Sequence, residues 1–272
     1  MQFGAECNML LAVRVKRFMI LSTACFVAFM RSGAPFQQSE AAMLKAKGEF
    51  ENQDWSKRTG LGTVGGNLAP LLIHDSPERV SRALEHQFGR PILNALGKTV
   101  KFGAVNLIVF RIKGQSWTTI EEVDNGDFDS PFPDLELSLS RSLKASVIYY
   151  SGSHVTGGYG YDRCDSGVET EYLFVKNDDK PDFWTKLPNR EKPGKGEAAI
   201  DYISRSFAKW KLFVPDFDGD YFVGGEDVVR GRSYALANPG IRWIFGRNLE
   251  GLSRPKFERV DFFPGPAVAG RP

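Results

Sequence analysis

Three closely spaced segments between residues 146 and 176 constrain the fold more than any other part of this sequence. Residues 146–150, 158–164 and 168–176 are rich in β-branched and aromatic side chains, and glycine-containing turns separate them. Segments of this composition, bounded by turn residues, are typical of β-strands. The connections are too short for parallel neighbours, which need a crossover of a dozen or more residues. We therefore predict an antiparallel three-stranded meander.

A second pair of strands precedes the meander. Residues 104–113 are rich in β-branched and aromatic side chains, and residues 116–123 follow after the tight connection Gly114-Gln115. Two strand-like segments joined by so short a turn indicate a β-hairpin.

Three further segments carry the signals of amphipathic helices. Ser76 followed by Pro77 marks the start of the first helix, and Gly89 marks its end. Residues 134–144 place three leucines four positions apart, and residues 197–212 place their apolar side chains on one helical face.

The order of the elements fixes the fold class. From residue 104 onwards they run strand, strand, helix, three strands, helix, without the alternating strand–helix–strand units of a parallel sheet. We predict an α+β fold in which an antiparallel sheet carries the helices on one face. Its domain should span residues 43–263, after an apolar N-terminal extension over residues 1–42 and before a flexible tail over residues 264–272.

The N-terminal extension allows several interpretations. Its apolar run, residues 18–30, follows three basic side chains and is shorter than the ~20 residues of a membrane-spanning helix, so no stable span is predicted. Basic residues, a short apolar run and a small-residue segment in this order resemble a secretory signal, with residues 39–41 as the better cleavage site. A terminal helix packed on the domain, or a true start at Met43, are the alternatives. These two alternatives together slightly favour a cytoplasmic protein over an exported or membrane-anchored one.

Charge and cysteine content exclude several classes of site. The net charge is +2, and the Lys and Arg residues are scattered among acids instead of forming the basic patch of a nucleic-acid-binding protein. Cys7, Cys25 and Cys164 lie far apart and form no CxxC pair, so neither a zinc site nor a disulfide framework is predicted. We therefore expect no nucleic-acid partner and no cofactor.

One acidic segment resembles a calcium loop. Four aspartates occupy positions 1, 3, 5 and 12 of an EF-hand-like pattern: Asp216, Asp218, Asp220 and Asp227. Carboxylates at alternate positions of a tight loop suit calcium, but position 6 needs glycine for the sharp turn and carries Tyr221. An acidic surface turn without a metal is the preferred interpretation, and calcium binding is the alternative.

Two hypotheses of different classes follow for the function. The preferred one is a non-enzymatic interaction or accessory protein that binds a protein partner through surface aromatics, with Trp117, Tyr149, Tyr159 and Tyr161 as candidates. The alternative is a hydrolase-like enzyme. Its site would be centred on His154, which lies in a polar turn between strands, together with Glu169 and Glu171. A cleft with perturbed titratable groups around His154 would favour the enzyme.

The last two strands of the meander also allow a prediction of register. A three-residue loop, Asp165-Ser166-Gly167, would pair Arg163 with Glu169 and keep Asp162 away from Glu171. This register would place four side chains on the buried face of the sheet: Cys164, Val168, Tyr172 and Phe174.

Four short motifs within residues 100–175 support a resemblance. They are residues 114–118 (GQSWT), 137–143 (LSLSRSL), 147–150 (VIYY) and 157–161 (GGYGY). In these motifs the chain resembles a group of bacterial proteins that carry no assigned activity, so the resemblance implies no substrate or cofactor. Residues 154–156 (HVT) depart from the Ser-Asp-Thr-like turn of that group.

Overall fold

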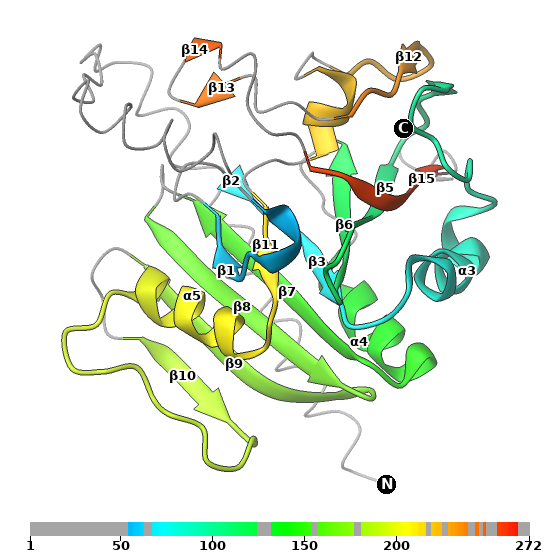
Figure 1. Cartoon of the computed structure of the whole chain (residues 1–272). Helices are drawn as coiled ribbons and strands as arrows, with labels where there is room; N and C mark the ends of the chain where they lie inside the picture. The colour runs from blue at the N-terminus through cyan, green and yellow to red at the C-terminus, as the bar shows by residue number, and fades with distance from the viewer. Residues whose placement is uncertain are drawn as a thin grey trace, which may run out of the picture. The chain divides into compact units, whose positions relative to one another are not determined.

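The computed structural model describes residues 54–62, 67–123, 132–153, 157–176, 181–215, 219–224, 228–238, 243–244, 247–248 and 255–265. All of them belong to the compact unit Met43–Pro272. Within these ranges, three helices accompany a large antiparallel sheet, which confirms the α+β class (Figure 1). The helices are α3 (Pro77–Phe88), α4 (Phe132–Leu143) and α5 (Ala199–Lys209).

The main sheet has nine strands, and every neighbouring pair in it is antiparallel. Eight strands follow the order β10-β9-β8-β7-β3-β6-β5-β15, and β2 pairs separately with β7. Their bounds are β2 (Asn67–Leu68), β3 (Leu71–Ile73), β5 (Asn106–Ile112), β6 (Thr118–Val123), β7 (Ser146–Ser153), β8 (Gly158–Asp165), β9 (Val168–Lys176), β10 (Asp182–Thr185) and β15 (Phe257–Pro264). The predicted hairpin is β5–β6, and the predicted meander is β7–β8–β9. Both are confirmed.

Strand β3 joins the hairpin to the meander, because it pairs with β6 on one side and with β7 on the other. Its three residues are fully buried. Leu71 and Ile73 point into the core under α3 and α4, whereas Leu72 points into the core under α5. A strand that is covered on both faces is a continuous apolar run without alternation, so periodicity alone does not reveal it.

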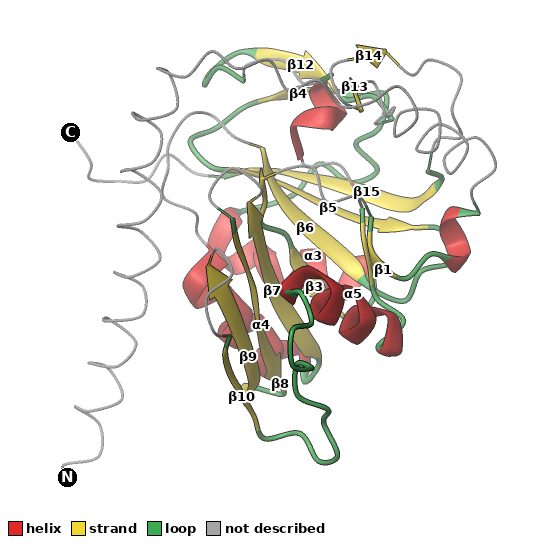
Figure 2. Ribbon diagram, turned by 90° about the vertical axis from the view of Figure 1, so that its left-hand side faces the viewer, coloured by secondary structure: helices red, strands yellow, loops and turns green. Residues whose placement is uncertain are grey.

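The helices cover both faces of the sheet (Figure 2). Val80 and Leu84 of α3 share one core cluster with Leu135 and Leu139 of α4, as expected for helices on one face. Helix α5 instead packs on the opposite face, where its buried side chains meet those of β7, β8 and β9. The sheet therefore carries helices on both faces, whereas the sequence predicted them on one face. The reason is that these strands carry apolar side chains on both faces, and each face must be covered.

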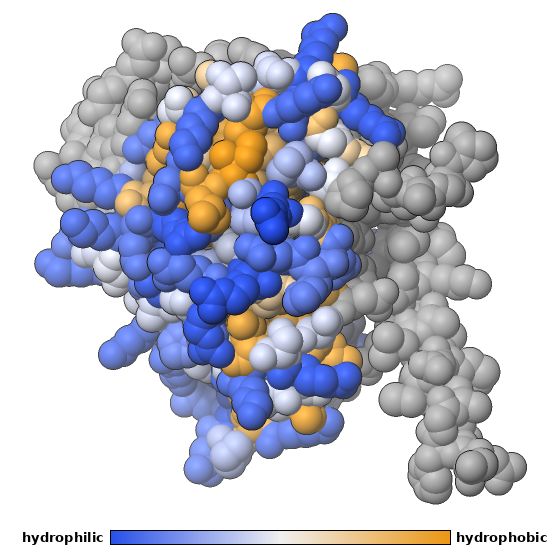
Figure 3. Space-filling model, turned by 90° about the vertical axis from the view of Figure 1, so that its right-hand side faces the viewer, coloured by the Kyte–Doolittle hydropathy of each residue, from blue (hydrophilic) through white to orange (hydrophobic). Residues whose placement is uncertain are grey.

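Small sheets and short helices close the remaining part of the α5 face. Their core cluster includes Trp55, Phe110, Phe213 and Phe222. The elements of this part are η1 (Trp55–Lys57), η2 (Gly219–Val223) and the strand pairs β1 (Gly60–Leu61) with β11 (Phe213–Val214) and β4 (Thr99–Lys101) with β12 (Ser233–Ala235). A separate strand pair is β13 (Trp243–Ile244) with β14 (Arg247–Asn248). On the face that carries α3 and β15, hydrophobic side chains gather in a patch bordered by hydrophilic ones (Figure 3).

The hairpin β8–β9 differs from the predicted register. Its turn has two residues, Ser166 and Gly167, both with positive φ (51° and 84°). A β-bulge then lets Arg163 face Glu171 and leaves Thr170 as the extra residue. The predicted pairing of Arg163 with Glu169 is wrong. The bulge still keeps Glu171 away from Asp162, because Asp162 faces Tyr172 instead.

The predicted buried face of β9 is also wrong. Glu171, Leu173 and Val175 are buried towards α5, whereas Val168 is 52% exposed. Because side chains alternate across a strand, one inserted residue moves all the following side chains to the other face.

Alanine at Gly167 tests the tight turn, with Gly196 as a matched control. Both have positive φ (84° and 77°). A Cβ added at Gly167 would lie 2.8 Å from the Cβ of Arg141 on α4, whereas a Cβ added at Gly196 would have no neighbouring heavy atom within 4 Å. A left-handed conformation costs an L-residue roughly 1–2 kcal/mol. We expect Gly196→Ala to lower the free energy of unfolding by about 1 kcal/mol and Gly167→Ala to lower it clearly more, as measured by urea denaturation. Equal losses would contradict the close approach to α4.

Candidate functional site

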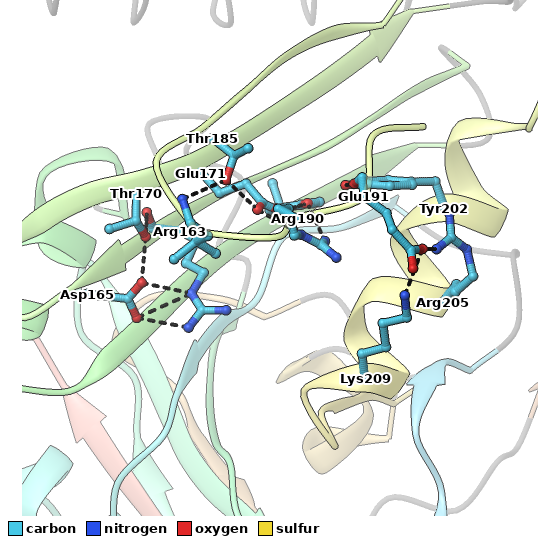
Figure 4. A network of polar contacts seen from close by, with 12 residues as sticks. Arg163, Asp165, Thr170, Glu171, Thr185, Arg190, Glu191, Tyr202, Arg205 and Lys209 are labelled. Carbon is cyan, nitrogen blue, oxygen red and sulfur yellow. Dashed lines mark hydrogen bonds and ion pairs between the residues drawn. The ribbon is translucent and has the colours of Figure 1, made fainter. Parts of the chain in front are cut away.

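A buried carboxylate on β9 organises the polar groups beneath α5. The Glu171 side chain is fully buried. It accepts hydrogen bonds from the hydroxyl of Tyr161 on β8 and from Oγ1 of Thr185 on β10, the latter at 2.9 Å. A buried charge is tolerated only where it is paired and hydrogen-bonded, and these two bonds come from the strands on either side. Figure 4 shows Glu171 beside Thr185 and Arg190.

Arg190 supplies the opposite charge from the segment that follows β10. Its Nε lies 2.9 Å from Oε1 and 2.8 Å from Oε2 of Glu171, and its side chain is 8% exposed. Burial would lower the pKa of Arg190, but the hydrogen bonds and the charge of Glu171 outweigh burial and raise it. Arg190 therefore stays charged.

The Tyr161 hydroxyl connects both members of this ion pair. It donates to Glu171 and accepts from Nη2 of Arg190 at 3.3 Å. Burial, followed by the negative charge of Glu171, raises the pKa of Tyr161. The phenol remains protonated and serves as a donor.

Stacking extends the site across α5. The guanidinium of Arg190 lies 4.7 Å from the centre of the Trp210 ring and 5.3 Å from that of Tyr202. Arg163 lies 4.5 Å from the same Trp210 ring, and Arg205 lies 5.3 Å from Tyr202. Such cation–π contacts are attractive because the ring face is negative. We call these five residues the arginine–aromatic cluster.

Acidic residues neutralise Arg205 of the cluster and Lys209, which lies outside it. Arg205 pairs with Glu197 at 3.0 Å and with Glu191 at 2.6 Å, and Lys209 pairs with Glu191 at 2.8 Å. Glu191 and Lys209 are exposed at 62% and 46%. These ion pairs lie at the surface, and Trp210, which follows Lys209 in the chain, is half-buried.

Asp165 holds Arg163 at the other end of the cluster. It accepts hydrogen bonds from Arg163, Ser146 and Thr170. Burial alone would raise the pKa of Asp165, but these three hydrogen bonds and the charge of Arg163 hold it below its usual value.

Asp165 also lines a polar cavity of about 260 Å³ at the ends of β3 and β8. A second acid of this cavity, Asp75, pairs with Arg79 at 2.9 Å. Both carboxylates of the cavity are therefore held by arginines. The lining residues are His74, Asp75, Arg79, Leu143, Lys144, Ala145, Ser146, Asp165 and Ser166.

The structure separates the two acids that the enzyme hypothesis groups together. Glu169 faces Cys164 and Glu171 faces Arg163. Cys164 and Arg163 are neighbours on β8, so they point to opposite faces of the sheet. The carboxylates of Glu169 and Glu171, which face them across the bulge, therefore also lie on opposite faces. His154 lies outside the described residues, so its role stays a prediction.

The candidate calcium loop is described at one of its four aspartates. Asp220 lies on η2 and is half-buried, whereas Asp216, Asp218 and Asp227 lie outside the described residues. Among the described residues, no group of three His, Cys, Asp or Glu side chains could hold a metal ion.

The aromatic side chains proposed for the surface belong largely to the core. Trp117 and Tyr161 are buried, while Tyr149 and Tyr159 pack partly buried against the core clusters. Two other residues, Arg190 and Trp210, are central to the site, and the sequence alone does not reveal them. No sequence signal marks Arg190, which lies in a polar segment with other cations, because its partner Glu171 is remote in the sequence.

Within the described part of the chain, no helix is long and apolar enough to cross a membrane. Comparison of the chain with protein-family models, with curated proteins and with solved structures found no match.

Removal of the Arg190 charge tests the buried ion pair. Arg190→Met leaves Glu171 buried and unpaired, so we expect a loss of about 3–5 kcal/mol in the free energy of unfolding, measured with urea. Adding Glu171→Gln to the Arg190→Met variant should recover part of that loss, because it removes the unpaired buried negative charge. Arg205→Met is the matched control and should cost less than about 1 kcal/mol, because that side chain is 36% exposed. Similar losses for the two single variants would contradict this account.

Acid titration tests Asp165. Its pKa in the folded protein lies below 3.8, the usual value of an aspartate, so its contribution to stability is present above about pH 4 and is lost as the pH falls through the folded pKa. We expect Asp165→Asn to be less stable than the wild type at pH 6, and the difference in unfolding free energy to shrink towards about pH 2. Glu85→Gln, exposed on α3, controls for the change in net charge. A difference that stays constant with pH for Asp165→Asn would argue against the hydrogen-bonded carboxylate.

Proposed function

We propose that this domain is a non-enzymatic interaction protein that binds a protein partner through the outer side of α5. We define the α5 surface as Arg190, Glu191, Arg205, Lys209 and Trp210. The observation that carries the proposal is the arginine–aromatic cluster, which brings Arg, Trp and Tyr side chains together beneath and around this surface. These three residue types dominate the binding energy of protein interfaces.

The distribution of polarity supports a protein partner. Trp210 is half-buried and stacks with Arg163 and Arg190, and the ion pairs of Glu191 with Arg205 and Lys209 lie at the solvent-exposed part of the surface. Protein interfaces have the same anatomy, with aromatic and arginine side chains at the core and a polar rim. Because acids neutralise the cations, the surface offers little attraction to a nucleic acid, whose binding depends on unpaired positive charge.

Rigidity supports binding as well. Stacking and ion pairs already hold the guanidinium groups of Arg163, Arg190 and Arg205 in place. Side chains that are ordered before binding lose less conformational entropy on association. The carboxylate of Glu171 has all its contacts within the protein, which favours a structural role for it over acid–base chemistry.

Affinity capture with matched variants tests the proposal. The full chain is immobilised, its partner is captured from the native host and purified, and the Kd is then measured with each variant. Arg205→Ala should weaken binding at least about tenfold, because it removes an exposed member of the cluster. Arg232→Ala, exposed beside β12, should leave the Kd unchanged. Equal affinities of both variants, at unchanged melting temperature, would show that the α5 surface is not the binding site.

A further inference from the structure

Strand β10 forms one edge of the main sheet (Figures 1 and 2). The backbone N–H of Lys186 donates to the carbonyl of Thr170 at 2.8 Å. Because bonded residues alternate along an antiparallel pair, Trp184 also bonds to β9, whereas the N–H and C=O groups of Phe183 and Thr185 point outwards. Within the described part of the chain, no strand pairs with this outer side.

The residues around β10 follow a pattern that is complementary to itself. Exposed edges are commonly protected by charges and prolines, and Pro181 precedes β10 directly. The two exposed charges, however, are opposite in sign. Asp182 lies two residues before Trp184, and Lys186 lies two residues after it.

We propose that two copies of this chain pair through β10 in antiparallel orientation, with Trp184 of each copy at the two-fold axis. Phe183 then faces Thr185 of the second copy. The backbone N–H and C=O groups of these two residues point outwards and form the N–H···O=C bonds between the copies. Asp182 faces Lys186 of the second copy on both sides of the axis. The two Trp184 rings meet as a cross-strand aromatic pair.

Neighbouring registers lose these contacts. A shift of two residues in one direction places Pro181, which has no N–H, opposite Thr185 of the second copy. A shift of two in the other direction places Lys186 opposite Trp184 and leaves Asp182 without its opposite charge. The register centred on Trp184 is therefore the one that satisfies the outward backbone groups and both charges.

A charge swap tests the pairing in the full chain. Sedimentation equilibrium at low ionic strength should show a reversible dimer of twice the 30.3 kDa chain mass. Asp182→Lys and Lys186→Asp each place like charges opposite one another, so each should raise the dimer Kd at least about tenfold. The double variant restores opposite charges and should restore the dimer. Lys256→Asp, exposed before the opposite edge strand β15, is the matched control and should leave the Kd unchanged.

A disulfide provides a second readout that does not depend on charge. Trp184→Cys places two thiols opposite one another at the axis, where Cα atoms of a non-hydrogen-bonded pair lie about 4.5 Å apart, within the range of a disulfide. Mild oxidation should crosslink this variant, while Lys256→Cys should stay uncrosslinked. A wild type that is monomeric at every concentration, a dimer whose Kd ignores the single swaps, or a double swap that fails to recover would each overturn the pairing. These variants leave the α5 surface intact, so the outcome is separate from that of the proposed function.

Discussion

The buried carboxylate of Glu171 constrains the whole region around α5. With no water to solvate it, the carboxylate needs a cation and hydrogen-bond donors within the protein. Arg190, Tyr161 and Thr185 meet this need from three different elements. The segment after β10 is consequently held against the sheet, and Arg190 in turn provides the surface on which Trp210 and Tyr202 of the α5 region stack.

A single inserted residue puts Glu171 in that position. The bulge at Thr170 changes the side-chain alternation of β9, so that Glu171 and Leu173 turn towards α5 together. The same insertion places Arg163 opposite Glu171 and Tyr172 opposite Asp162, which avoids a pairing of like charges. One irregularity thus sets the buried face, the charge pairing and the place of the arginine–aromatic cluster.

The far edge of the sheet uses a related device. Asp261 on β15 is fully buried and accepts hydrogen bonds from Ser81 on α3 at 2.7 Å and from the backbone of Asn94 at 3.0 Å. Arg259 supplies the charge at 2.8 Å and also pairs with Glu78. One buried carboxylate near each edge therefore ties a helix or a loop to the sheet, and the apolar core lies between them.

The sequence by itself determined the local elements and the fold class. Ser76 and Gly89 mark the ends of α3, and the strand composition predicts the β5–β6 hairpin and the β7–β8–β9 meander, because these signals act within a few residues. Only the tertiary structure decided the bulge, the insertion of β3 between hairpin and meander, and the choice of Arg190 as the partner of Glu171. Each depends on the combined free energy of contacts between residues far apart in the chain, and with 35 Lys and Arg residues available, no local pattern selects that partner.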